Sequence, residues 1–248
     1  MSKSVIIIPS RLAATRLPNK PLLRVNEKTL IMHVYEKAVK SEIGDVYVAT
    51  CDDEIANEVQ KNGGKIITTD ASHESGTDRV FEAAKKLDLQ QTDYIINVQG
   101  DEPMIDPLDI KNLNFVSKEK NLDFSTLAFN ISNNDNYKEE NIVKVFTRDK
   151  ITNLSSSVAE NFSRKVNFKN ISDKIYHHYG IYLYKFNTLE KFVKLDHSKN
   201  EKIEKLEQLR ALDNNMKIYV LLASHFSIGI DTIENLLEYK KIMKKTKK

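Results

Sequence analysis

Apolar positions in the first hundred residues alternate between two patterns. Short continuous apolar runs are typical of strands buried on both faces, and apolar residues recurring every three or four positions are typical of amphipathic helices. The runs predict strands at 4–9, 45–50, 65–69 and 93–100. The periodic segments predict helices at 30–41, 53–64 and 77–87. Because strands and helices alternate at this pace, the sequence predicts βαβ units in a parallel sheet with helices on both faces.

The pattern loosens after the helix expected to begin near Asp106. Further strands are predicted at 122–131, 141–147, 176–186 and 216–223. Further helices are predicted at 187–195, 201–215 and 231–245. The polar stretch 149–174 predicts a flexible excursion or part of a subdomain. With no repeat and no linker, we expect one α/β domain over residues 1–248, with a mostly parallel sheet and a smaller, partly β lobe inserted at about 122–186.

The composition argues against a disordered protein and against a nucleic-acid-binding protein. Of the 248 residues, 40% are hydrophobic and 29% charged, which is normal for a globular protein and argues against disorder. The formal charge of +3 is concentrated at the end of the chain, where KKIMKKTKK carries six lysines, so the remainder is slightly acidic. This distribution argues against a broad nucleic-acid surface. The basic tail is expected to be the solvated end of the last helix, with a membrane-surface contact as the alternative.

The sequence predicts neither a disulfide nor a membrane-spanning segment. Cys51 is the single cysteine, so an intramolecular disulfide is impossible. No stretch approaches the ~20 apolar residues that a membrane-spanning helix needs, and the apolar run at 5–8 is too short for a signal peptide. We therefore expect a cytoplasmic protein without membrane insertion.

The first predicted strand ends in a positively charged loop. Arg11, Arg16 and Lys20 follow within twelve residues, and Pro18 and Pro21 stiffen the loop. Ligands of parallel sheets bind beyond the carboxyl ends of the strands, and arginine and lysine suit phosphate. The Walker A and GxGxxG patterns are absent, and a solvated surface loop is the alternative.

Carboxylates follow at two other positions. VQGDEP places Asp101 and Glu102 at the end of the fourth predicted strand, and GIDT places Asp231 before the last helix. Carboxylates beside phosphate repel it unless a cation such as Mg²⁺ lies between them. The structural alternatives are a turn before the helix near Asp106 and an N-cap at Asp231.

Two further segments carry polar groups of interest. HESGTDR has Ser75 and Asp78 at the spacing of a capping box, and a capped helix start can also offer N–H groups to a nucleotide. HHYGIYLY and LEQLRAL supply polar groups in an aromatic setting that suits a polyhydroxylated substrate. The paired histidines can equally be exposed strand residues, and no third ligand supports a zinc site.

Together these residues resemble the 3-deoxy-manno-octulosonate (KDO) cytidylyltransferases, or CMP-KDO synthetases. The segments stand in the family's order along nearly the whole chain: IIIPSRLAATRLPNKPL, VATCDDEIA, HESGTDR, INVQGDEPMI, HYGIYLYK, LEQLRAL and GIDTIENL. The resemblance implies a single nucleotidyltransferase domain with a nucleotide-diphospho-sugar transferase-like, Rossmann-like fold. It also implies a homodimer that converts CTP and KDO into CMP-KDO and pyrophosphate with Mg²⁺, for lipopolysaccharide synthesis.

The resemblance implies roles for individual residues. Arg11, Lys20, Asp101 and Asp231 are the catalytic candidates, with Asp101 and Asp231 as Mg²⁺ ligands. The nucleotide candidates are Pro9, Ser10, Arg11, Arg16, Lys20, Ser75, Gly76, Thr77, Gln99 and Gly100. The candidates for binding the acidic sugar are Gln99, Arg164, His178, Tyr184, Glu207 and Gln208.

One departure from the family leaves the sugar open. Where the family has an aromatic-Ser-Arg segment followed by Ile-Pro, this chain has Ser156 at the arginine position and lacks the Ile-Pro pair. Arg164, in a nearby Phe-Ser-Arg segment, is the candidate replacement. The alternatives are therefore CTP-dependent activation of 8-amino-KDO or a sialic acid, a catalytically silent nucleotide-binding regulator, and a nucleotidyltransferase that uses another base.

Overall fold

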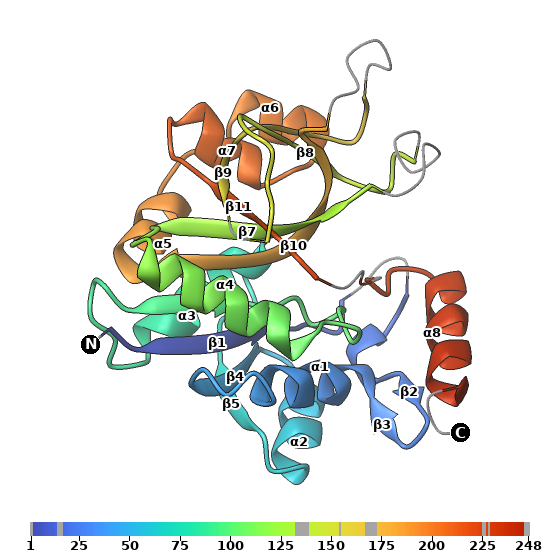
Figure 1. The fold of residues 1–248 in the computed structure, drawn as a ribbon. Helices are drawn as coiled ribbons and strands as arrows, with labels where there is room; N and C mark the ends of the chain where they lie inside the picture. The colour runs from blue at the N-terminus through green and yellow to red at the C-terminus, as the bar shows by residue number, and fades with distance from the viewer. Residues whose placement is uncertain are drawn as a thin grey trace.

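A computed structural model describes residues 2–13, 17–131, 139–153, 155–166, 173–224, 227 and 229–245. Within these ranges nine strands form one sheet in the order β5-β4-β1-β6-β10-β7-β11-β9-β8. Their bounds are β1 Ser4–Pro9, β4 Asp45–Thr50, β5 Lys65–Thr68, β6 Tyr94–Asn97, β7 Phe124–Asn130, β8 Lys144–Thr147, β9 Ser157–Ser163, β10 Ile175–Lys185 and β11 Tyr219–Leu222. Figure 1 shows the sheet running through the molecule with helices around it.

The helices lie on both sides of this sheet. Their bounds are α1 Leu30–Val39, α2 Asp53–Lys61, α3 Gly76–Lys85, α4 Pro107–Glu119, α5 Phe186–Val193, α6 Lys199–Glu204, α7 Gln208–Asp213 and α8 Ile233–Lys245. A 3₁₀ turn at Lys20–Leu22 and a short hairpin of β2 Arg24–Val25 and β3 Lys28–Thr29 complete the N-terminal part. The expected α/β class is confirmed.

The apolar run of β1 is continuous because this strand is buried on both faces. Val5 and Ile7 join a core cluster that includes α3, α5 and α7 side chains. Ile6 and Ile8 join a second cluster built with α1, α2 and α4. Alternate residues of a strand point to opposite faces, so one run of six buried residues serves two cores.

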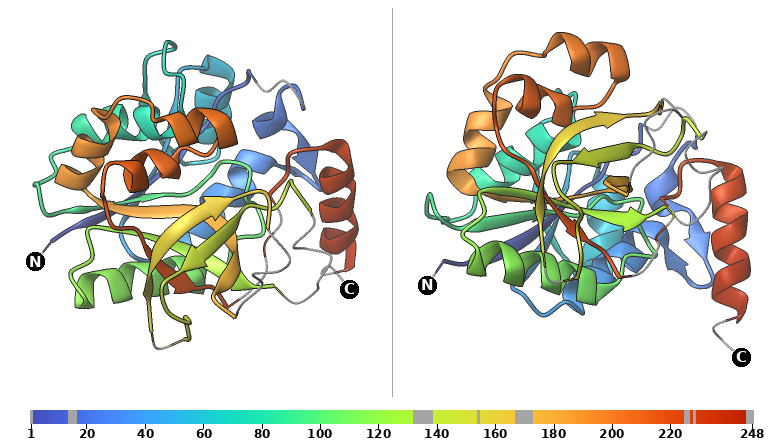
Figure 2. Two further views of the ribbon diagram at one scale, coloured as in Figure 1. Left: turned by 90° about the horizontal axis from the view of Figure 1, so that it is seen from above. Right: turned by 45° about the horizontal axis from the view of Figure 1, so that its top comes forward.

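The two halves of the sheet differ in strand direction. β5, β4, β1 and β6 are all parallel, as the alternating pattern predicts. β10 then runs antiparallel to both β6 and β7, whereas β7 and β11 are parallel to each other. β8 and β9 add an antiparallel extension. In the left view of Figure 2 these strands, in yellow, lie on the side of the molecule opposite α2 and α3.

The inserted lobe expected at about 122–186 overlaps the sheet itself. Its first and last strands, β7 and β10, are central members of the sheet, and β8 and β9 form the outlying extension. A separate lobe within one nucleotidyltransferase domain stays a prediction.

One element prediction was wrong in detail, and one strand was not predicted. The helix expected at 201–215 is two helices, α6 and α7, because Lys205 adopts a left-handed conformation at φ 54° and ends α6. The polar stretch 149–174 contains strand β9, in which Ser157, Ala159 and Phe162 are buried. A serine and an alanine at buried positions conceal the apolar alternation that would have marked a strand.

No helix among the described residues has the length and apolar character needed to cross a membrane.

Candidate active site

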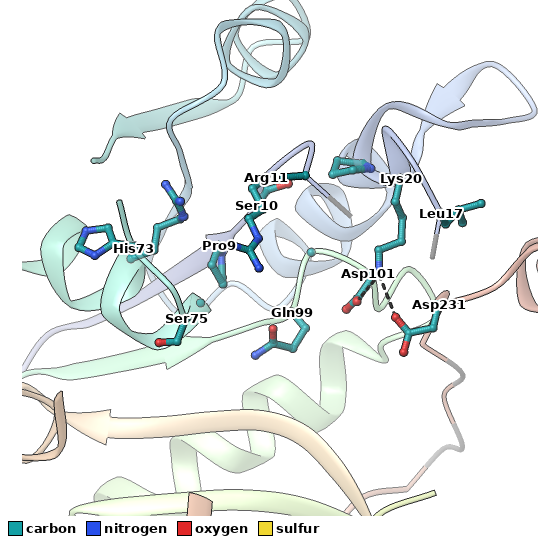
Figure 3. A pocket seen from close by; sticks show the side chains of 15 residues that line it. Pro9, Ser10, Arg11, Leu17, Lys20, His73, Ser75, Gln99, Asp101 and Asp231 are labelled. Atoms are coloured by element: carbon teal, nitrogen blue, oxygen red, sulfur yellow. Dashed lines mark hydrogen bonds and ion pairs between the residues drawn. The ribbon is translucent and has the colours of Figure 1, made fainter. Parts of the chain in front are cut away.

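A cavity of about 380 Å³ opens at the carboxyl ends of β1 and β6. Its walls come from the opening loop, the start of α3, the segment after β6 and the residue before α8 (Figure 3). The lining residues are Pro9, Ser10, Arg11, Ala13, Leu17, Lys20, Pro21, His73, Ser75, Gly76, Arg79, Gln99, Gly100, Asp101 and Asp231. Segments more than 200 residues apart in the sequence therefore meet at one edge of the sheet, where ligands of parallel sheets bind.

Backbone contacts hold the opening loop against the neighbouring strand. The N–H of Ser10 donates to the carbonyl of Ala49 at 2.9 Å, and the N–H of Leu12 donates to the Asp52 carboxylate at 2.8 Å. The exposed Arg11 lies between these two anchors and lines the cavity. Arg16, a candidate for the nucleotide, lies outside the described residues.

Lys20 joins the two aspartates expected to hold a metal ion. Its ammonium donates to Asp101 Oδ2 at 2.7 Å and to Asp231 Oδ1 at 3.0 Å. Burial alone would lower the pKa of Lys20, but attraction and hydrogen bonds from Asp101 and Asp231 outweigh burial and raise the pKa. Lys20 is therefore a charged counter-ion between two carboxylates.

The backbone places Asp231 beside Asp101. The N–H of Ile230 donates to the carbonyl of Asp101 at 2.8 Å, which ties the segment before α8 to the segment after β6. The Thr232 hydroxyl accepts from the N–H of Asn235 at 3.3 Å. Because Thr232 makes this capping contact, the Asp231 carboxylate can face the cavity.

Glu102 lies outside the cavity although it follows Asp101 directly. Its partly buried carboxyl accepts a hydrogen bond from the Ser227 hydroxyl at 3.0 Å. Burial, reinforced by the negative charge of Asp101, raises the pKa of Glu102 to about 8. The two adjacent carboxyl groups thus have different environments, and Asp101 alone faces the cavity.

The oxygens of Asp101 and Asp231 suit a divalent cation. Both carboxylates converge on one point, which the Lys20 ammonium occupies here. Across the described residues, no group of three or more His, Cys, Asp and Glu side chains could hold a metal. Mg²⁺ commonly binds through one or two carboxylates, with phosphate oxygens and water as its other ligands. The donor set therefore fits an ion that is completed by a bound nucleotide.

Most nucleotide candidates line the cavity. Ser75 caps α3, its hydroxyl accepting from the N–H of Asp78 at 3.0 Å, as the sequence predicts. A Cβ at Gly100 would lie 2.9 Å from the carbonyl oxygen of Pro9, so only glycine allows the two loops to approach this closely. Thr77 turns away from the cavity, and its hydroxyl donates to Glu207 Oε2 at 2.5 Å.

The sugar candidates occupy a more buried region. Gln99 alone among them lines the cavity. His178 is buried, with its Nε2 3.1 Å from the Thr126 hydroxyl, and burial lowers the pKa of His178 to about 3. Tyr184 is a core residue that packs on Phe124 with 4.4 Å between ring centroids.

Glu207 and Gln208 lie at the start of α7, and Arg164 directly follows β9. Glu207 bonds Thr77 and lies 3.5 Å from the Arg210 guanidinium. Gln208 is buried at the start of α7. Arg164 follows β9 and donates to the carbonyl of Glu140 at 3.2 Å, away from the cavity lining.

Sequence reasoning missed several cavity residues, of which His73 and Arg79 carry chemistry. His73 Nε2 lies 2.5 Å from Glu82 Oε2. Arg79 is buried, and its Nη1 donates to the Thr69 hydroxyl at 2.5 Å and to the carbonyl of Asp70 at 3.3 Å. Both belong to HESGTDR, and the signal that could have found them is their position on either side of the Ser75 cap.

Comparisons with known proteins point to one family. A family model described as cytidylyltransferase matches residues 5–218. A 3-deoxy-manno-octulosonate cytidylyltransferase of Thermodesulfovibrio yellowstonii is 43% identical over 242 residues, covering 94% of this chain and 95% of that protein. Its counterpart in Paramagnetospirillum magneticum is 38% identical and covers 97% of both chains.

Solved structures extend the likeness. One titled as CMP:2-keto-3-deoxy-manno-octonic acid synthetase complexed with CTP has a TM-score of 0.89 at 35% identity, covering 99% of this chain and 100% of that chain. A UDP-glucose pyrophosphorylase complexed with UDP-glucose, at 11% identity and a TM-score of 0.69, shares the fold alone. The chain therefore belongs to the cytidylyltransferase family, among the 3-deoxy-manno-octulosonate cytidylyltransferases.

Proposed function

We propose that this protein transfers the cytidylyl group of CTP to KDO, giving CMP-KDO and pyrophosphate for lipopolysaccharide synthesis. Relatives at 43% and 38% identity over nearly the full length carry the name of this activity. The observation that carries the proposal is the contact of Lys20 with Asp101 and Asp231 at one end of the cavity. This cluster combines a phosphate-binding cation with two candidate metal ligands, which a protein that only binds nucleotide does not need.

Arg11 and the three charged residues of the cluster have two roles in this reaction. Arg11 and Lys20 bind the triphosphate and stabilise the negative charge that develops on the leaving pyrophosphate. Asp101 and Asp231 would hold Mg²⁺, which when bound polarises the α-phosphate and lowers the pKa of the attacking hydroxyl. Both substrates are anions, so these cations also offset their mutual repulsion.

The reaction needs no strong protein base. The anomeric oxygen of KDO forms a bond to the α-phosphorus, the bond from that phosphorus to pyrophosphate breaks, and the hydroxyl proton is lost to water. His178 is buried and its pKa is lowered to about 3, so it would contact the sugar acid as a neutral side chain. Gln99 and His178, with Tyr184, Glu207 and Gln208, are proposed to bind the sugar acid.

The identity of the acidic sugar is the open part of this proposal. Ser156 stands where the family has arginine, and Arg164 bonds the carbonyl of Glu140 rather than lining the cavity. This observation favours a second candidate, activation of 8-amino-KDO or a sialic acid, whose carboxylate would be bound differently.

A pyrophosphate-release assay separates these candidates. The purified protein is given CTP, Mg²⁺ and either KDO, 8-amino-KDO or a sialic acid. We expect the highest kcat/KM with KDO. Release with a sialic acid and none with KDO would overturn the choice of sugar, and CTP binding without release from any of them would indicate a regulator.

We also propose a homodimer located in the cytoplasm, as the family resemblance implies. Light scattering after size-exclusion chromatography should give twice the monomer mass. A monomer mass across the working concentration range would refute the dimer.

A further inference from the structure

The cavity has two chemically different ends. Lys20, Asp101 and Asp231 cluster at one end, and His73 and Ser75 lie at the other (Figure 3). A nucleotide whose triphosphate lies at the Lys20 end therefore places its base toward His73. This orientation rests on the proposed function.

The partner of His73 determines which ring nitrogen carries a proton. Glu82 Oε2 lies 2.5 Å from His73 Nε2 and accepts from the N–H of Asp70 at 2.8 Å, while Glu82 Oε1 lies 2.7 Å from the Lys86 ammonium. These donors outweigh the effect of burial and lower the pKa of Glu82 to about 2. An ionised carboxylate only accepts hydrogen bonds, so His73 Nε2 must donate.

In the neutral form of the His73 ring, the other nitrogen is then an acceptor. A neutral imidazole has one donor nitrogen and one acceptor nitrogen, so protonation at Nε2 leaves the lone pair on Nδ1. Within the described part of the chain, the hydrogen bond of the His73 ring is made through Nε2. The side chain is 22% exposed and lines the cavity.

We propose that Nδ1 of His73 accepts a hydrogen bond from the 4-amino group of cytosine and so selects CTP over UTP. Cytosine presents an N–H donor at position 4, whereas uracil presents a carbonyl oxygen there. With uracil, two acceptors would face each other and both would lose hydrogen bonds to water. For a partly exposed site this loss corresponds to a preference of up to about 10²-fold. Glu82 is the positioning residue that selects the tautomer.

Two substitutions test this assignment. His73→Phe keeps the ring and removes the acceptor. Glu82→Leu removes the acceptor that holds the proton on Nε2, so His73 can then also carry its proton on Nδ1. His197→Phe is the matched control, because His197 also pairs with a glutamate, Glu201, at 2.9 Å but lies outside the cavity lining.

The readouts are CTP and UTP affinities by calorimetry, with Mg²⁺ present, and kcat/KM for both nucleotides with KDO. We expect His73→Phe to reduce the CTP preference by about 10²-fold, Glu82→Leu to reduce it by a smaller factor, and His197→Phe to leave it unchanged. Equal losses for both nucleotides, an unchanged ratio, or a wild-type protein that binds UTP as well as CTP would overturn the role of His73.

These outcomes are separable from the proposed function. A wild-type protein that binds CTP selectively, in a manner that depends on His73, but forms no product would refute the transfer reaction and leave the base assignment intact. Turnover with CTP, together with an unchanged preference for CTP in both variants, would refute the base assignment and leave the transfer reaction intact. A protein that binds neither nucleotide would overturn both.

Discussion

Lys20 lies between two carboxylates that would otherwise repel each other. Its ammonium is 2.7 Å from Asp101 and 3.0 Å from Asp231, and its side chain is only 15% exposed. The same atom is a candidate for binding phosphate. Lys20 is therefore both a structural counter-ion of the ligand-free site and a competitor for the metal position.

Replacing Lys20 by methionine should separate these two roles. Lys20→Met is expected to lower turnover by about 10²–10³-fold, because one electrostatic contact to the reacting phosphates is lost. Binding of Mn²⁺ without nucleotide should become tighter, because the competing ammonium is gone. Steady-state kinetics and an electron paramagnetic resonance titration measure the two effects.

Lys65→Met is the control for Lys20→Met. Lys65 bonds Asp45 at 2.7 Å in an exposed ion pair outside the cavity lining, so its loss should change neither quantity. Weaker Mn²⁺ binding or unchanged turnover in Lys20→Met would contradict the dual role.

His178 gives the molecule a pH-dependent stability. Burial, with a smaller contribution from His177, lowers the pKa of His178 to about 3, whereas an unfolded histidine has a pKa near 6.5. Between these values the unfolded chain binds a proton that the folded chain excludes, so acidification favours unfolding. Each pH unit below about 6 should cost about 1.4 kcal/mol of unfolding free energy through this residue.

His178→Gln removes this titration. Urea unfolding of both proteins at pH 7, 6 and 5 should show that the stability advantage of the wild type shrinks as the pH falls. Parallel losses in the two proteins would show that His178 does not titrate on unfolding in this range.

At the scale of elements, the close approach of two strand ends shapes the cavity. The segment after β6 passes so near to the end of β1 that a Cβ at Gly100 would lie 2.9 Å from the carbonyl oxygen of Pro9. Because the contact is with backbone, Gly100→Ala must push one loop away from the other.

Gly100→Ala should therefore lower both activity and stability. Overpacking of this kind typically costs about 1–3 kcal/mol, and displacement of Asp101 should reduce turnover further. Gly180→Ala is the steric control, because its Cβ would meet Gln99 Cγ at an ordinary 4.0 Å. Thermal unfolding and kcat report the two effects, and equal stability of the two variants would contradict this account of the contact.

The sequence predicted the elements of the parallel half better than those of the second half. The strands at 4–9 and 45–50 form long apolar runs because both faces of the sheet are covered. β9 lies between β11 and β8 and buries small or polar residues such as Ser157, so it has no comparable run. The break at Lys205 depends on one left-handed residue within a helical pattern, which periodicity does not detect.

At the scale of the whole molecule, the chain brings Lys20, Asp101 and Asp231 to one edge of the sheet. Sequence reasoning could place Lys20 and Asp101 there because both follow predicted strands. The sequence suggested Asp231 only as a partner for Asp101. The backbone hydrogen bond between Ile230 and Asp101, which brings Asp231 to this edge, is seen only in the folded structure. His73 also follows a predicted strand, the one at 65–69, but the capping-box spacing of Ser75 and Asp78 offered a structural explanation for its segment.

The measurement that tests the central claim is pyrophosphate release from CTP and KDO with Mg²⁺, by the wild type and Asp101→Asn side by side. The two proteins should have similar melting temperatures, because the Asp101 side chain is partly exposed. We predict steady release by the wild type and a loss of at least about 10²-fold in kcat for the folded variant. Full turnover by Asp101→Asn, or none by the folded wild type, would contradict the account.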